Sequence, residues 1–171
     1  GITAFTDLVL DCVRDASERT GLGMALVIAA NRTRHPLDAR TLARLAAQYA
    51  DRGVVGFGLS NDERRGRTAD FAPAFAIAER AGLLLAPHGG ELLGPDHVRM
   101  CLDQLHPGRL GHGVRSAEDP ELLDRVVQAG VLDGDHRLVR ERFEQFDVLL
   151  AERGYLRAPQ NDGPHWFSFT Q

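Results

Sequence analysis

Two histidines and a glutamate follow short apolar runs in this chain of 171 residues. His88 and Glu91 lie behind Leu83–Leu85, with two glycines between them, and His112 follows the next apolar stretch. Neutral imidazole is a standard zinc ligand, and a nearby carboxylate that does not bind the metal can serve as a general acid or base. Glycine lets the backbone and a substrate approach closely. These residue types predict metal-assisted acid–base chemistry.

Each of these residues also has an ordinary structural interpretation, which the sequence leaves open. The segment around His88 fits a turn with an exposed histidine, and Glu91 then lies near the positive end of a helix. His112, between two glycines, fits a core or turn residue. Considered together the two histidines favour a shared site, because the carboxyl ends of neighbouring parallel strands open onto one rim.

Other candidates lie on the same predicted side of the molecule. Asp62 and Glu63 follow a strand and either contact the substrate or form a solvated loop with the arginines around them. His35 also follows a strand and is a weaker candidate for a substrate contact. We expect the other histidines before residue 130 to be surface residues and Cys101 to be a small core residue. These histidines are His97 and His106.

The elements that must position these residues alternate between strand and helix. Apolar runs predict strands, and helical periodicity between glycine and proline signals predicts helices. The strands are Met24–Ala30, Val54–Leu59, Leu83–Ala86 and Arg109–Leu110, and the helices cover about 3–19, 36–52, 69–81, 95–105 and 120–129. A β–α repeat of about 25–30 residues predicts an α/β fold with a parallel sheet and crossover helices. Both an open doubly wound sheet and a (β/α)8 barrel fit, although four strands are half of a barrel that takes about 250 residues.

Composition restricts the class of protein. The hydrophobic content of 43% and the net charge of −4 fit a globular domain and argue against a nucleic-acid surface. We expect no membrane span, and the two cysteines, which form no CxxC pair, favour a reducing, cytoplasmic compartment. The start at Gly1 leads us to expect a fragment or a processed product. Residues 1–130 form the β–α domain, whereas residues 131–171 read as an unrelated charge-rich helix and an irregular tail.

Three motifs make residues 3–130 resemble the middle of the adenosine deaminase family, within the amidohydrolase superfamily. The motifs are VGFGLSNDE at 55–63, PHGGE at 87–91 and RLGHGV at 109–114. The resemblance implies an incomplete (β/α)8 barrel, with about four central βα units, that acts in zinc-dependent hydrolytic deamination. It implies that His88 is a zinc ligand, that Glu91 protonates the purine ring and that His112 orients the attacking hydroxide. Substrate contacts are assigned to Asn61, Asp62 and Gly90, with Asn61 replacing a glycine that is common in the family.

The resemblance also implies what this sequence lacks. The family's first strand carries an HxH pair of zinc ligands and its last strand an aspartate pair, and neither occurs here. We therefore expect impaired activity on the substrate, which is adenosine, adenine or a modified adenine nucleoside. The alternative is a non-catalytic remnant or interaction module that self-associates through unpaired strand edges. Residues 133–158 weakly resemble a segment of insertion-sequence transposases. Residues 131–171 carry more acidic than basic residues, which argues against nucleic-acid binding.

Overall fold

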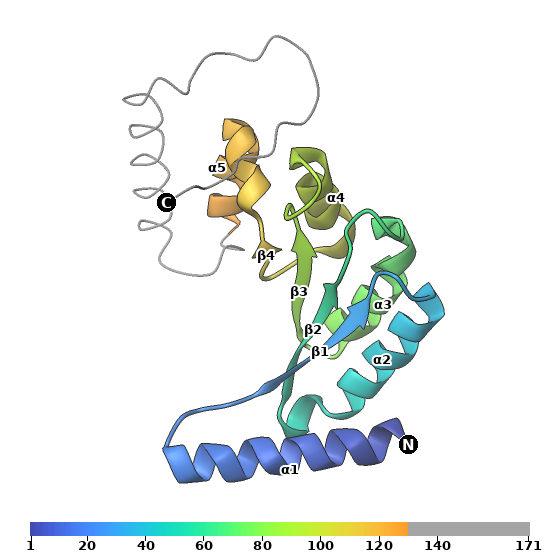
Figure 1. Ribbon diagram of the computed structural model, residues 1–171, viewed down its shortest axis with the longest axis vertical. Coiled ribbons are helices and arrows are strands. Elements are labelled where there is room, and N and C mark those ends of the chain that lie inside the picture. Colours follow the sequence, from blue (N-terminus) through green and yellow to red (C-terminus); the bar gives the residue numbers. More distant parts are fainter. Residues whose placement is uncertain (130–171) are drawn as a thin grey trace, which may run out of the picture. The chain divides into compact units, whose positions relative to one another are not determined.

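The computed structural model describes residues 1–129, which are coloured in Figure 1. Strands and helices alternate along these residues. The strands are β1 (Leu26–Asn31), β2 (Val54–Ser60), β3 (Leu84–Gly89) and β4 (Gly111–His112), and the α-helices are α1 (Ile2–Thr20), α2 (Pro36–Gln48), α3 (Thr68–Arg80), α4 (Pro95–Leu105) and α5 (Pro120–Gln128). Two short 3-10 helices, η1 (Ala50–Arg52) and η2 (Val114–Glu118), complete the described elements. No helix among these residues is long and apolar enough to cross a membrane.

The strands form one parallel sheet in the order β1-β2-β3-β4. Neighbours in the sequence are therefore neighbours in the sheet, and each pair is joined through a helix, as crossover connections require. Residues 56–59 of β2 pair with residues 84–87 of β3, and residues 88–89 of β3 pair with residues 111–112 of β4. This register places the last residues of β3 directly beside β4.

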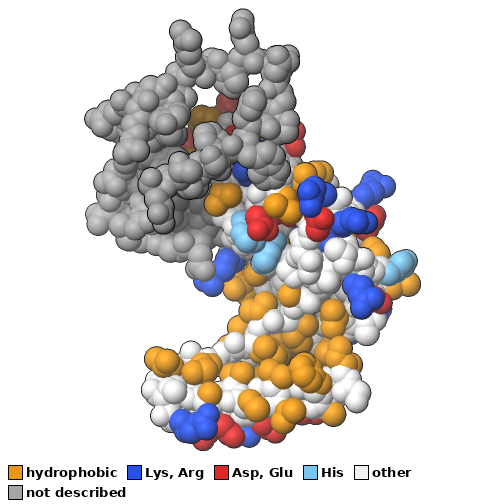
Figure 2. Space-filling view, viewed as in Figure 1, with side chains coloured by type: hydrophobic (Ala, Val, Ile, Leu, Met, Phe, Trp, Pro, Cys, Tyr) orange, Lys and Arg blue, Asp and Glu red, His pale blue; other side chains and the backbone are white. Residues whose placement is uncertain are grey.

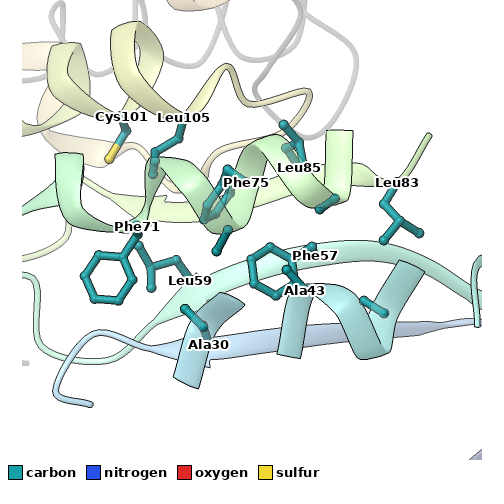
Figure 3. Packing of buried hydrophobic residues seen from close by; sticks show 14 of the residues in the cluster. Ala30, Ala43, Phe57, Leu59, Phe71, Phe75, Leu83, Leu85, Cys101 and Leu105 are labelled. Atoms are coloured by element: carbon teal, nitrogen blue, oxygen red, sulfur yellow. The ribbon is translucent and has the colours of Figure 1, made fainter. Parts of the chain in front are cut away.

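The hydrophobic core lies between the sheet and helices α2, α3 and α4 (Figure 3). Phe57 of β2 and Phe75 of α3 pack together in this core, with ring centroids 5.2 Å apart in an edge-to-face arrangement. Leu59 points to the same side as Phe57 because side chains two residues apart share one face of a strand. Burial of these side chains fixes which residues of β2 face the helices.

The opposite face of the sheet carries small and apolar residues. A Cβ atom at Gly56 would lie 2.9 Å from the Leu84 carbonyl oxygen and 3.2 Å from Val27 Cγ2. A Cβ atom at Gly58 would lie 3.2 Å from the Ala86 carbonyl oxygen and 3.3 Å from Ala29 Cβ. Glycine at these positions lets the strands approach closely, and Val27 and Ala29 remain exposed.

Helix α1 contacts the domain through polar groups and through Leu10, and it leaves other apolar side chains exposed. The Tyr49 hydroxyl donates a hydrogen bond to Asp7 Oδ1 over 2.9 Å, and Arg52 donates to the same oxygen over 3.0 Å. Phe5 and Leu8 are 65% and 61% exposed. Figure 2 shows hydrophobic side chains along the helix. The predicted helix is confirmed. Its Leu10 packs against the core, whereas Phe5 and Leu8 are uncovered in the described residues.

The predicted strands are confirmed in number and order, with differences in their bounds. Strand β1 spans residues 26–31 rather than 24–30, and β2 ends at residue 60 rather than 59. Strand β3 continues to Gly89, so His88 lies inside the strand rather than behind it. The strand predicted at Arg109–Leu110 is wrong by two residues, because the residues that pair with β3 are Gly111 and His112. The prediction followed Leu110, which is buried, although burial there does not require strand pairing. The predicted helix and tail within residues 131–171 lie outside the described residues.

Candidate functional site

Strands β3 and β4 bring three predicted site residues together at the carboxyl ends of the sheet. One ligand atom from each of His88, Glu91 and His112 lies within 4.8 Å of the others. His88 is partly buried, whereas Glu91 and His112 are exposed. Figure 2 shows histidine and acidic side chains gathered side by side on this part of the surface. Within the described part of the chain, these three side chains are the ones close enough together to hold a metal ion.

One nitrogen of His112 faces both of its partners. His112 Nε2 lies 3.2 Å from His88 Nδ1 and 3.3 Å from Glu91 Oε2. The two imidazole rings meet edge to face at 90°, with centroids 4.5 Å apart. Since neutral imidazole carries a proton on one nitrogen only, His112 Nε2 either donates to one of these atoms or presents a lone pair toward them. The three groups can therefore share a proton or a cation.

Backbone features next to the histidines permit this close approach. A Cβ atom at Gly111 would lie 2.5 Å from His88 Cδ2, so a larger residue would displace the His88 ring. His112 itself has a left-handed backbone, with a φ of 63°. A non-glycine residue in that conformation is uncommon, and such strain concentrates at functional sites.

The electrostatic surroundings favour a neutral His88. Burial lowers the pKa of His88 from its usual value, and the neighbouring His112 lowers it further. Glu91 and Glu63 act in the opposite direction, but the net shift of the pKa is downward. A neutral imidazole retains the lone pair that a metal ligand needs. His88 is thus suited to coordination at neutral pH.

The predicted substrate-contacting residues lie around this cluster without joining it. Asn61 is exposed at the end of β2 and has a φ of 78°. Asp62 accepts hydrogen bonds from Arg64 over 2.8 and 3.2 Å, which matches the solvated-loop interpretation of this residue. Gly90 has a φ of 74°, and a Cβ atom there would lie 2.5 Å from Val98 Cγ2. The His35 ring accepts from the Leu37 N–H at the start of α2 and so caps that helix.

Glu63 has a position that neither sequence interpretation included. Its side chain is fully buried and accepts hydrogen bonds from three successive backbone N–H groups. The donors are Glu91, Leu92 and Leu93, at distances of 3.0 to 3.2 Å. Glu63 therefore binds the turn that carries Glu91 and does not lie in a solvated loop.

His97 was expected at the surface and is instead only 3% exposed. Its Nδ1 atom lies 3.3 Å from Glu63 Oε2, and its Nε2 atom lies 3.9 Å from the Cys101 sulfur. The helical spacing of α4 contained the signal, because His97 precedes buried Cys101 by four residues and buried Leu105 by eight. Cys101 is buried as predicted, and His106 is exposed as predicted.

A partial parallel α/β barrel with two histidines and a glutamate at its carboxyl end is typical of metal-dependent hydrolases. A family model described as adenosine deaminase matches residues 1–132. The chain belongs to the adenosine deaminase family.

Similar proteins agree with this assignment. A putative adenosine/adenine deaminase of Streptomyces virginiae is 67% identical over 127 residues, which are 74% of this chain and 38% of that protein. The crystal structure of an adenine deaminase from Arthrobacter aurescens superposes with a TM-score of 0.65 and 29% identity, over 72% of this chain and 38% of that one.

A zinc-containing amidohydrolase from Burkholderia ambifaria has a TM-score of 0.65 and 28% identity, over 70% of this chain and 33% of its own. The chain thus spans well under half the length of the relatives that it matches. Its four parallel strands correspond to part of the amidohydrolase (β/α)8 barrel.

Proposed function

We propose that this chain carries part of the active site of a zinc-dependent deaminase that acts on adenine or adenosine. The observation that carries the proposal is the convergence of His88, Glu91 and His112 within 4.8 Å. The names of the similar proteins support adenine and adenosine as substrates. We further propose that Asn61, Asp62 and Gly90, at the ends of β2 and β3, contact the purine.

The donor set suits zinc. His88 would hold the ion, because imidazole nitrogen is a donor that zinc prefers. His112 Nε2 lies 3.2 Å from His88 Nδ1 and 3.3 Å from Glu91 Oε2, so an orienting base and an acid lie next to this ligand. Bound zinc supplies a water of lowered pKa, so that hydroxide is available near neutral pH.

In hydrolytic deamination, each of two side chains of the cluster carries out a different proton transfer. The Glu91 carboxyl group gives a proton to the ring nitrogen beside the amine-bearing carbon, which lets water add to that carbon. His112 Nε2 orients the attacking water and takes its proton. That proton passes to the departing amine, which leaves as ammonia. The proton of the added hydroxyl group returns to Glu91 as the carbonyl forms. The separation of 3.3 Å between His112 Nε2 and Glu91 Oε2 puts acid and base beside one reacting carbon.

These roles also predict a limit on the activity of the 171-residue chain. A catalytic zinc is held by about three protein ligands. If Glu91 and His112 act as acid and orienting base, His88 is the one remaining ligand within the described cluster. We propose that the other ligands come from outside these residues and that the chain alone deaminates poorly.

We expect the purified metal-free chain to bind Zn²⁺ weakly and to release no measurable ammonia from adenine or adenosine. Replacing His88 by alanine should lower the Zn²⁺ affinity at least about tenfold, because the most buried donor of the cluster is lost. Isothermal titration with Zn²⁺ measures the affinity, and an ammonia assay measures turnover. His106→Ala removes an exposed histidine elsewhere and should leave the affinity unchanged. Equal affinities in the H88A variant and the parent chain would contradict the assignment of His88, and rapid ammonia release would contradict the predicted limit.

A specific observation also favours self-association as a second function. Within residues 1–129, β1 and β4 are the outer strands of the sheet, and apolar side chains of α1 are exposed. We propose that a second copy of the chain covers these surfaces. Because the outer strands are different and parallel, a twofold arrangement can place β1 of each copy beside β4 of the other. Both edges are then paired at once, in eight parallel strands.

Light scattering after size exclusion should give the mass of a dimer. Replacing Phe5 and Leu8 together by glutamate should shift the protein toward monomer, because charge is placed on the exposed apolar side of α1. Leu37→Glu, at an exposed apolar position of α2, is the matched control and should stay dimeric. A sharp monomer with a cooperative melt for the parent chain would exclude this proposal.

A further inference from the structure

Beneath the His88–Glu91–His112 cluster lies a second group of polar side chains, which are buried. Arg32 is 1% exposed, Glu63 is 2% exposed and His97 is 3% exposed. They come from different elements, since Arg32 follows β1, Glu63 follows β2 and His97 is in α4. Cys101 lies among them, with its sulfur 3.6 Å from Arg32 Nη2 and 3.9 Å from His97 Nε2. None of these four residues belongs to the proposed metal-binding group.

Both charged members of this buried group bind the backbone of the segment that carries the site. Arg32 Nη2 donates a hydrogen bond to the His88 carbonyl oxygen over 3.1 Å. The Glu63 carboxylate accepts from the N–H groups of residues 91, 92 and 93. One side chain therefore holds the carbonyl at the start of the segment and the other holds the amides at its end.

The segment between these two points needs such restraint. Gly89 and Gly90 separate His88 from Glu91, and glycine loses more conformational freedom on ordering than any other residue. Gly90 has a positive φ of 74°, which lets the chain turn back toward Glu63. Without fixed ends, this pair of glycines would allow the Glu91 carboxylate to move relative to the two imidazole rings.

Burial of a guanidinium and a carboxylate is a poor source of stability, because the cost of removing both charges from water offsets much of what their contacts gain. A hydrophobic residue of similar volume often stabilises such a position equally well. What apolar residues cannot supply is a carboxylate that accepts three directed hydrogen bonds. This argument favours a role for Glu63 in geometry rather than in core packing.

We propose that Glu63 is a positioning residue of the site, which with Arg32 fixes the main chain from His88 to Leu93 and so sets Glu91 against His88 and His112. The inference rests on the proposed function, since it assigns Glu63 to the support of that metal and acid group. Glu63 acts through backbone N–H groups and touches neither metal nor purine. His97 and Cys101 fill the space between Glu63 and Arg32 and keep water from these hydrogen bonds.

The first test is amide hydrogen exchange on the full metal-free chain. Glu63→Gln keeps the size of the side chain but turns an NH₂ group toward N–H donors. Exchange at residues 91–93 should increase at least about tenfold more than exchange of amides in the middle of β2, which follow the stability of the whole domain. Asp62→Asn, which alters the adjacent half-buried carboxylate, should change neither region. Unchanged exchange at residues 91–93, or an equal increase throughout the domain, would overturn the proposal.

The second test is Zn²⁺ affinity measured by isothermal titration. Changes to groups that orient ligands typically weaken metal binding about 10–100-fold, and we expect E63Q to fall in this range. Glu63→Asp retains the charge with a shorter reach, so its affinity should lie between those of E63Q and the parent chain. It also provides a folded variant if E63Q does not fold. If the parent chain binds no Zn²⁺, the proposed function fails, and the exchange rates still decide the role of Glu63.

Discussion

Replacing Phe57 by alanine is expected to cost about 3–5 kcal/mol of unfolding free energy, which is a large fraction of the stability of an ordinary domain. Phe57 is completely buried, and its ring packs edge to face on Phe75 of α3. The substitution removes this contact and leaves a cavity between the sheet and the helices, where close packing allows little relaxation. Urea denaturation followed by circular dichroism measures the loss as a lower transition midpoint.

Val55 provides the control, because it lies on the same strand two residues earlier and is 47% exposed. Val55→Ala should change the unfolding free energy by about 0.5 kcal/mol or less. A similar loss in both variants would show that burial of Phe57 against α3 does not set the size of its contribution. The stability of β2 also matters for the site, because β2 leads directly into the segment that contains Asn61 and Glu63.

The order of elements could be predicted because the sequence marks their ends strongly. Gly53 and Gly82 each have a positive φ and end a helical stretch immediately before a buried strand. The end of β3 is harder to predict, because Pro87 cannot donate to a strand ladder and proline is uncommon inside a strand. Strand β4 carries no apolar signal of its own, because its two residues are a glycine and a histidine. Only pairing with β3 defines it.

The three clustered residues of the candidate site could be predicted from the sequence, but their buried support could not. His88, Glu91 and His112 were identifiable because each follows an apolar run, and strand ends on one side of a parallel sheet converge. The buried position of Glu63 could not be predicted, because the neighbouring arginines give its segment the composition of a solvated loop. Its true partners are backbone N–H groups some thirty residues later, and no side-chain pattern records such contacts. Buried polar support of this kind becomes visible only when the fold brings the segments together.

Glu63 should also make the stability of the domain depend on pH in acid. Burial by itself would raise the pKa of this carboxyl, but the contact with His97 and the N–H groups of residues 91–93 lower it from 4.5 to about 2. A group whose pKa is lower in the folded state stabilises that state above its unfolded pKa and loses the effect as pH falls. The relevant window therefore runs from about pH 4.5 down to about pH 2.

The shift corresponds to about 3 kcal/mol at neutral pH, of which about 2 kcal/mol should be lost between about pH 6 and pH 3. The measurement is urea denaturation of the parent chain and E63Q across this range. Other carboxylates titrate in both proteins, so the difference between the two unfolding free energies isolates Glu63. That difference should shrink as the solution is acidified, because protonated Glu63 and glutamine are both neutral. A difference that stays constant from neutral pH to pH 3 would mean that Glu63 is not held as a carboxylate by the backbone of residues 91–93.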